Sequence, residues 1–465
     1  MNQASIDRLR DYLAQLPPKA QALLMREFER AIERGEDTAV ATFVLAQLRK
    51  VVRQSDDATP RTDDPARLVF RPLEPFLIDN APAARPGQIR RSSLAPVWVW
   101  LSREGIPDQV QAFEAALAQV GEQATSTEID RLVRTVQIAA GEAIVATAGQ
   151  AAGHDRQRVL SRIGGPNVVE DIASIGAALQ AREALDALSL RLSGQIRQFG
   201  ESQIASVIAS LNVPTLQTPQ VLPFALSLVM QRLAAPWQII RLGVSVAGSD
   251  DEIRVGATPY GVAVTMAIQD LSHAAAELRV DIRRGQFTNT SNYLKKLHDG
   301  VRGLRTELDI RSDSTWGRQI ASIRVEISDS LKSEIESVPG RVRRILRQRP
   351  DKDITANTRI DPSEVDETAS LIDFVAVCRT YAGELAINEV TLRAYSDLQH
   401  YVEKATESLV ESLRAGDARV RAFRQMQVEA AVRFCNLLFG PDYASLMSRS
   451  AEMARTGERK QPRAS

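Results

Sequence analysis

Cysteine is nearly missing from this 465-residue chain, which holds only Cys378 and Cys435. Both fall at apolar positions of helical patterns, so we expect buried thiols rather than the dense disulfide framework of small secreted proteins. The N-terminus opens on the charged, helix-patterned stretch Ser5–Arg8 and shows no apolar leader. We therefore expect a cytoplasmic protein. Arginine far outnumbers lysine among its basic residues, which is typical of a GC-rich bacterial genome.

Aromatic residues and long apolar runs are also scarce. Aromatics make up 5% of the chain, whereas small aliphatic residues are plentiful, a composition that favours helix–helix packing over sandwiches or propellers. The longest apolar stretches, Val136–Ala148 and Val221–Met230, fall short of the roughly 18 residues that a membrane span requires. A hydrophobic fraction of 44% excludes wholesale disorder.

The residue patterns of common catalytic and metal sites are absent. None of the four histidines has a second histidine or a cysteine at metal-ligand spacing, and no glycine-rich phosphate loop is present. His298 and Asp299 are adjacent, and neighbouring side chains on a helix point about 100° apart, so we expect poor geometry for a catalytic pair. Asp250-Asp251-Glu252 is typical of a helix N-terminus rather than of a calcium loop. We expect no cofactor and no metal.

What the chain does contain is pervasive 3.6-residue periodicity. Apolar residues recur on one face through one segment after another, and helix starts carry capping residues such as Ser249 before Glu252 and Asp361 before Pro362. The sequence predicts an all-α protein, with more than two thirds of its residues helical. A small N-terminal helical unit precedes a larger helical bundle or elongated helical stack.

The pattern also predicts boundaries along the chain. We expect an N-terminal unit of three helices over 1–54 and a proline-containing linker over 55–91, exposed on both sides of an apolar island at 68–78. The main helical domain covers 92–453, with a possible sub-boundary near 214–218. A disordered tail follows at 454–465. Two prolines prevent the island from being one regular helix.

A heptad-like seam runs from Ile327 to Ile345 and contains Pro339 and Gly340. Because proline lacks an amide hydrogen and clashes with the preceding turn, one helix is expected to end near Ser337 and another to begin at Pro339. The seam then indicates antiparallel packing rather than a dimeric coiled coil.

Charge is balanced over the whole chain but not along it. Residues 279–349 carry sixteen Lys and Arg against nine Asp and Glu, while residues 350–417 carry six against fourteen. The basic segment ends in five arginines with no acid among them: Arg341, Arg343, Arg344, Arg347 and Arg349. These arginines either pair with the acidic segment or are simply solvated, which we favour, or they bind an acidic protein, nucleic acid or an anionic membrane.

The island at 68–78 also allows two interpretations. Phe70 and Phe76 either help to strap it across the main body, which we favour, or anchor it as a docking peptide for another protein.

These features do not specify a reaction. The leading hypothesis is a non-enzymatic helical scaffold or adaptor that contacts a partner protein through charged helical faces. One alternative is a peripheral protein that binds nucleic acid or an anionic membrane through 341–349. Another is a helical enzyme with a pocket that short motifs do not reveal.

Overall fold

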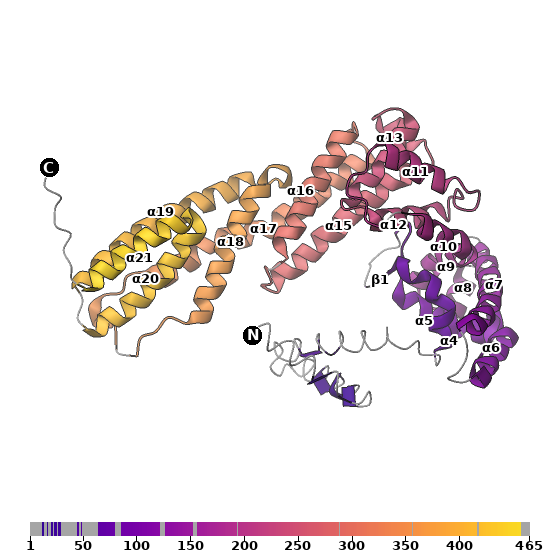
Figure 1. Ribbon diagram of the computed structural model, residues 1–465, viewed down its shortest axis with the longest axis horizontal. Coiled ribbons are helices and arrows are strands. Elements are labelled where there is room, and N and C mark those ends of the chain that lie inside the picture. The colour runs from indigo at the N-terminus through magenta and orange to yellow at the C-terminus, as the bar shows by residue number, and fades with distance from the viewer. Residues whose placement is uncertain are drawn as a thin grey trace. The chain divides into compact units, whose positions relative to one another are not determined.

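Helices dominate the part of the chain that the structure describes. The computed structural model describes scattered positions between 12 and 48 and then residues 64–79, 85–120, 126–151, 156–192, 194–287, 289–355, 357–415 and 418–456. Helices account for 81% of it, and its two strands are two residues long each, so the predicted all-α fold class is confirmed (Figure 1). The three helices expected over 1–54 fall largely outside the described residues. Some described side chains there form a small apolar cluster: Leu13, Leu16, Leu24, Met25, Phe28, Val44 and Leu48.

The chain divides into two compact units, each built from two separate stretches. Unit 1 comprises Met1–Glu74 and Arg91–Gln180, and unit 2 comprises Pro75–Arg90 and Ala181–Ser465. The stretch 214–218 lies within unit 2, in a run of turns. The other boundaries expected from the sequence stay predictions.

Unit 1 is a set of helices in which the two longest pack closely together. Its elements are α4 Pro65–Phe70, the first part of the 3-10 helix η1 Arg71–Phe76, η2 Arg91–Ser93, α5 Leu94–Trp100, the π-helical turn η3 Leu101–Gly105, α6 Pro107–Val120, α7 Ser126–Ala151, α8 Arg156–Ile163 and α9 Pro166–Gln180. Helices α7 and α9 pack together where Gly176 leaves room for Val145, since a Cβ on Gly176 would lie 2.8 Å from Val145 Cγ2. Asp171 of α9 is buried and accepts a 2.6 Å hydrogen bond from Ser93 Oγ.

Unit 2 begins with the segment 75–90 and continues after Ala181. Its first elements are β1 Leu77–Ile78, β2 Ile89–Arg90, α10 Arg182–Arg191, α11 Glu201–Leu211, α12 Leu222–Arg232, η4 Pro236–Ile240, α13 Arg241–Ala247, α14 Glu252–Gly256 and α15 Gly261–Arg283. Strands β1 and β2 pair in parallel, with Leu77 opposite Ile89. Gly87, at φ +70°, lies so close to Pro223 O that a Cβ would come within 2.3 Å of it.

This packing corrects one expectation about the linker. Residues 81–91 were expected to be exposed. Positions 81–84 lie outside the described residues, but Ile89 and Arg90 are buried. Linker-like composition misled here because the glycine turn and the strand pairing fold this short segment against α12, where its one large aliphatic residue is enclosed.

The remainder of unit 2 consists of long helices packed side by side. They are α16 Thr290–Glu307, α17 Thr315–Leu346, α18 Pro362–Leu385, α19 Asn388–Ala415, α20 Ala418–Phe439 and α21 Pro441–Thr456, with the 3-10 helix η5 Asp351–Asp353 between α17 and α18. Asp361 caps α18 as predicted, accepting a hydrogen bond from Ser363 N. Helix α21 extends three residues into the segment 454–465 that was expected to be disordered, and the rest of that segment lies outside the described residues.

Two local predictions in unit 2 are wrong. Helix α17 runs without interruption through Pro339, because the seam residues on both sides, Ile335 and Val342 among them, are completely buried and hold the helix in place. Helix α14 is capped by Asp251, whose side chain accepts from Arg254 N, while Ser249 instead accepts from Asp251 N in the turn before it.

Candidate interaction surface

The basic and acidic segments lie against each other in unit 2. Helix α17 packs on both α18 and α19, so the end of one charge block meets the start of the other. Four ion pairs join them: Arg305–Glu384, Glu336–Arg393, Arg341–Glu367 and Arg344–Glu364. All of these pairs are at least partly exposed, so each contributes on the order of 0–1 kcal/mol to stability. The ion pairs between the two charge blocks therefore add little to the stability of the fold, although they lie where α17 meets α18 and α19.

The five arginines at the end of the basic block fall into two groups. Arg341 and Arg344 face α18 and pair with its first acidic residues, Glu367 and Glu364. Arg343, Arg347 and Arg349 are exposed, and no acidic group among the described residues lies within ion-pair distance of them. We call these three residues the arginine surface.

Aromatic rings support two of these three guanidinium groups. Arg343 lies over the ring of Tyr401 in α19, 5.7 Å from its centroid, and Arg349 lies over Phe423 in α20, at 5.4 Å. Burial raises the pKa of the Tyr401 hydroxyl, and the positive charges of Arg343 and Arg347 oppose that rise. A guanidinium stacked on a ring is partly ordered before it binds anything.

The end of α17 beneath the arginine surface is well anchored. Gln427 of α20 donates hydrogen bonds to Ile345 O and Arg347 O, two carbonyls that the helix itself leaves without partners. Gln348 donates to Ser408 Oγ of α19 at 2.8 Å. The backbone that carries the arginine surface is thus held by both neighbouring helices.

Phe70 and Phe76 do not contribute to any exposed surface. Phe70 is buried in unit 1, edge-on to Trp98 at 6.2 Å between ring centroids. Phe76 is buried in unit 2, edge-on to Phe224 at 5.0 Å. The fold encloses both rings, and the choice between a strap and a docking peptide stays a prediction.

The sequence also singled out the adjacent pair His298 and Asp299 of α16. Against expectation, His298 and Asp299 do approach, with 3.1 Å between Nδ1 and Oδ1, and the His298 ring also packs on Tyr381. Within the described chain, the hydrogen bonds and ion pairs of these two residues include no serine, threonine or cysteine that could act as a nucleophile. Across the described parts of the chain, no three His, Cys, Asp or Glu residues gather as metal ligands, and no helix is both long and apolar enough to cross a membrane.

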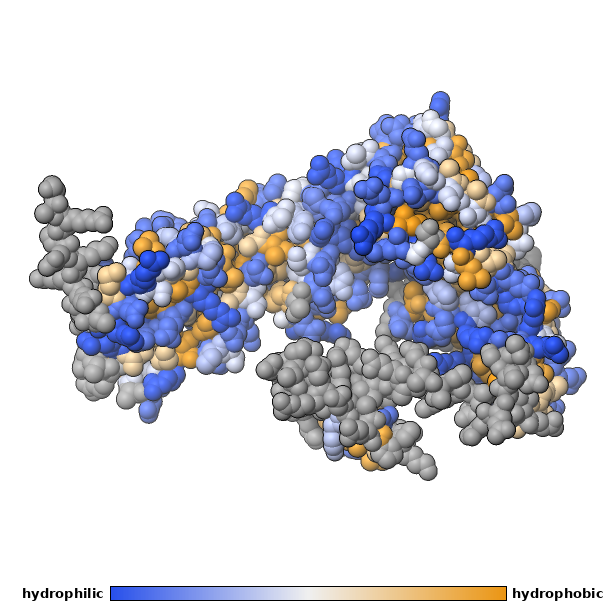
Figure 2. Space-filling model, in the orientation of Figure 1, coloured by the Kyte–Doolittle hydropathy of each residue, from blue (hydrophilic) through white to orange (hydrophobic). Residues whose placement is uncertain are grey.

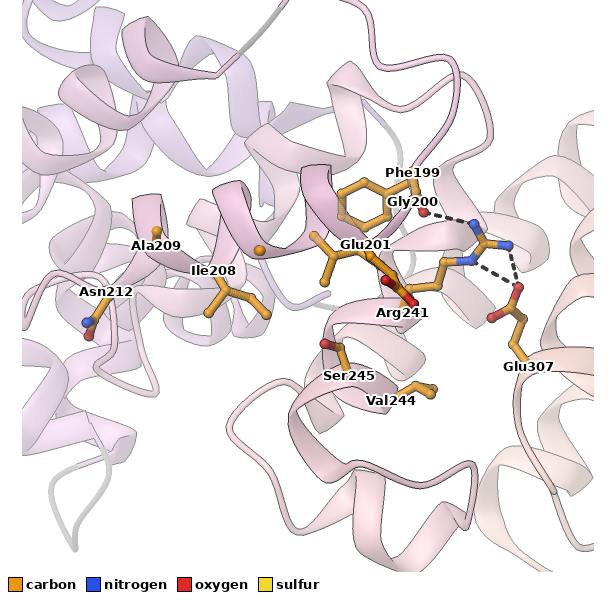
Figure 3. A pocket seen from close by; sticks show the side chains of 12 residues that line it. Phe199, Gly200, Glu201, Ile208, Ala209, Asn212, Arg241, Val244, Ser245 and Glu307 are labelled. Carbon is orange, nitrogen blue, oxygen red and sulfur yellow. Dashed lines mark hydrogen bonds and ion pairs between the residues drawn. The ribbon is translucent and has the colours of Figure 1, made fainter.

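Sequence reasoning missed a groove between α11 and α13. It has a volume of about 840 Å³ and opens to solvent along one side. Figure 3 shows residues from Glu201 at the start of α11 to Asn212 just after its end along one wall, Val244 and Ser245 of α13 on the other, and Arg241 with Glu307 at one end. The apolar positions of α11 at four-residue spacing were the available signal, but the sequence does not show that part of this face lacks a covering helix.

Comparisons with protein-family models, with curated proteins and with solved structures found no match to this chain. Its function is therefore argued from the geometry of its own residues.

Proposed function

We propose that this protein is a non-enzymatic helical adaptor that binds an acidic segment of a partner protein through the arginine surface. The observation that supports the proposal most directly is that the five arginines at the end of the basic segment differ in whether they have an acidic partner. Arg341 and Arg344 have acidic partners in α18, whereas Arg343, Arg347 and Arg349 are exposed without one in the described chain. Exposed guanidinium groups are well suited to carboxylates, because their donors match a carboxylate in a two-bond fork.

The restricted motion of the arginine side chains before binding also favours binding. The stacking of Arg343 on Tyr401 and of Arg349 on Phe423 restricts these side chains before a partner arrives. Less side-chain entropy is then lost when a carboxylate binds, at roughly 0.5–1.5 kcal/mol for each long side chain that binding would otherwise immobilise.

The same contacts argue against nucleic acid as the partner. Single-stranded nucleic acids gain much of their affinity by stacking bases on exposed aromatic rings. At this surface the rings of Tyr401 and Phe423 are already covered by arginines, and three cations form a small footprint for a duplex or a membrane. We therefore place nucleic acid and anionic membrane second to an acidic protein segment.

The test compares three defined probes on the full chain: labelled polyglutamate, a labelled DNA duplex, and vesicles with anionic lipid. Binding is followed by fluorescence anisotropy or cosedimentation at about 50 and 200 mM salt, a range over which screening weakens exposed ion pairs. The variant combines Arg343→Glu, Arg347→Glu and Arg349→Glu. The matched control is Arg318→Glu, because Arg318 is an exposed arginine near the other end of α17.

We expect polyglutamate to bind the native chain in a salt-sensitive manner, to lose at least tenfold in affinity in the triple variant, and to bind the control normally. Circular dichroism should show the same helix content in all three proteins. Loss of DNA or vesicle binding in the triple variant, without polyglutamate binding, would move the assignment to nucleic acid or membrane. Equal affinity in the triple variant and the control would remove the arginine surface as a functional site.

A further inference from the structure

The groove between α11 and α13 is a separate feature of unit 2 with its own chemistry. Its α11 wall presents Ile204, Ala205, Ile208 and Ala209, a stripe that follows the four-residue spacing of one helical face. Ala205 and Ala209 are exposed, and Ile208 is partly exposed. In Figure 2, apolar surface lies beside hydrophilic surface over α11 and α13. Apolar side chains that gather in a groove and are rimmed by polar residues are a feature of interaction sites.

The shape of the groove suits a helix better than a small molecule. Its α11 wall spans eleven residues, or about 16 Å at 1.5 Å per residue, which is the length of three helical turns. The small side chains of Ala205, Ala209 and Ser245 allow a third backbone to approach closely, since interaxial distance follows the size of the side chains at the contact. An acyl chain or a drug-sized ligand needs a site that encloses most of its surface, whereas this groove is open along one side.

The charged side chains at the groove indicate which charge an occupant should carry. Arg241 is neutralised locally, because it pairs with Glu307, donates a 2.9 Å hydrogen bond to Phe199 O and lies over the ring of Trp237. Glu201, at the first position of α11, is exposed and has no cationic partner among the described residues. Because Arg241 and Glu307 pair, the side-chain charges at this end of the groove sum to one negative charge, which the positive end of α11 offsets in part and which a lysine or arginine of an occupant complements.

We propose that this groove binds an amphipathic helix of a partner protein, about three turns long. The aliphatic side chains of the partner helix, spaced i, i+4 and i+7, pack on Ile208 and Val244. A small residue of that helix packs on Ala205 and Ala209, where the two helices cross, and a lysine or arginine at its end faces Glu201. This is the helix-in-groove mode of recognition, in which one apolar face supplies most of the contact. The site is independent of the arginine surface and does not rest on the acidic partner proposed above.

The experiment uses the full chain and a labelled synthetic peptide of about fifteen residues, with leucines at the stated spacing, alanine at most other positions to favour the helix, and two lysines at its C-terminal end. A second peptide of the same composition has its leucines scattered around the helix, and a fluorescent fatty acid is the third probe. Ala209→Trp fills the groove. Ser206→Trp is the matched control, on an exposed position of α11 that does not line the groove.

We expect the amphipathic peptide to bind at least tenfold more tightly than the scattered one, to lose at least tenfold in Ala209→Trp, and to bind Ser206→Trp normally. Glu201→Gln should weaken binding several-fold and reduce its salt dependence. Should Ala209→Trp lower the helix content, Ala205→Lys replaces it, because a charge at that exposed site opposes the apolar stripe without filling a core. No peptide binding, equal binding of the two peptides, or displacement of the peptide by the fatty acid would each overturn the proposal.

Discussion

Two glycines in unit 2 illustrate how strongly single positions depend on their surroundings. Gly303 of α16 faces the indole of Trp237, and a Cβ there would lie 2.6 Å from three atoms of that ring. Gly383 of α18 has open space where its Cβ would stand. Both glycines lie in helices, where glycine costs about 0.5–1 kcal/mol relative to alanine. The helix propensity of the substitution is thus the same at the two positions, and they differ in the space available for an added Cβ.

We predict opposite effects of the same substitution at these positions. Gly303→Ala should lower the free energy of unfolding of unit 2 by about 1–3 kcal/mol, because the rigid indole cannot yield without disturbing the core. Gly383→Ala should raise it by about 0.5–1 kcal/mol. Urea denaturation followed by circular dichroism measures both changes. A stabilised Gly303→Ala protein would mean that Trp237 moves aside more easily than its packing indicates.

At the scale of whole elements, α17 is unusual because it contains an interior proline. Pro339 has no amide hydrogen to donate to Ile335 O, yet the helix spans Thr315–Leu346 without a break. An interior proline costs about 3 kcal/mol relative to alanine. Its ring is buried, however, and each methylene so enclosed returns about 0.8 kcal/mol. The helix persists because its buried face contributes more than the proline removes.

We therefore expect Pro339→Ala to stabilise unit 2, by about 1 kcal/mol, as the regained hydrogen bond outweighs the lost ring contacts. Pro339→Gly serves as the comparison and should be about 1 kcal/mol less stable than Pro339→Ala, since glycine restores the amide but not the helix preference. Thermal unfolding followed by circular dichroism provides the measurement. A loss of stability in Pro339→Ala would show that ring packing is the larger contribution.

Local patterns were sufficient to predict the helices themselves. Apolar residues recur at helical spacing from Leu371 to Leu385 of α18 and are buried almost throughout, and Asp361 caps that helix. Both features can be read from the sequence, because periodicity and capping depend on residues close in sequence. Pro339 was misread because tertiary packing overrode a local rule. Asp251 was missed as a cap because three acceptors stand in a row and only the backbone decides among them.

The candidate surfaces were predictable only in part, for a similar reason. The arginine cluster is visible in the sequence, but which members pair with Glu364 and Glu367 depends on how α17 and α18 pack. The groove joins Ile208 to Val244, residues distant in sequence and brought together by tertiary packing. The apolar spacing of α11 is typical of a helix with a packed face, but it does not show that part of this face is open.

At the scale of the whole molecule, each compact unit combines two separate stretches of chain. Phe76 belongs to unit 2, although the residues on both sides of the segment 75–90 belong to unit 1. Phe76→Ala should therefore lower the stability of unit 2, by about 3–5 kcal/mol as for other buried aromatics.

Calorimetry should resolve two transitions for a chain of two units. Phe76→Ala should shift the transition that Leu331→Ala shifts, and leave in place the one that Ile144→Ala shifts, because Leu331 is buried in unit 2 and Ile144 in unit 1. If Phe76→Ala moved the transition of Ile144→Ala instead, the segment 75–90 would belong energetically to unit 1.

The interleaved segment also has a consequence for synthesis on the ribosome. Phe76 packs on Phe224, and Gly87 closes on Pro223, so their partners are translated about 150 residues later. At 5–20 residues per second this delay lasts about 7–30 s, far longer than the time in which helices form. During that interval the nascent chain carries the apolar side chain of Phe76 without its final contact, the ring of Phe224. This short segment is therefore where we expect a molecular chaperone to engage the growing polypeptide.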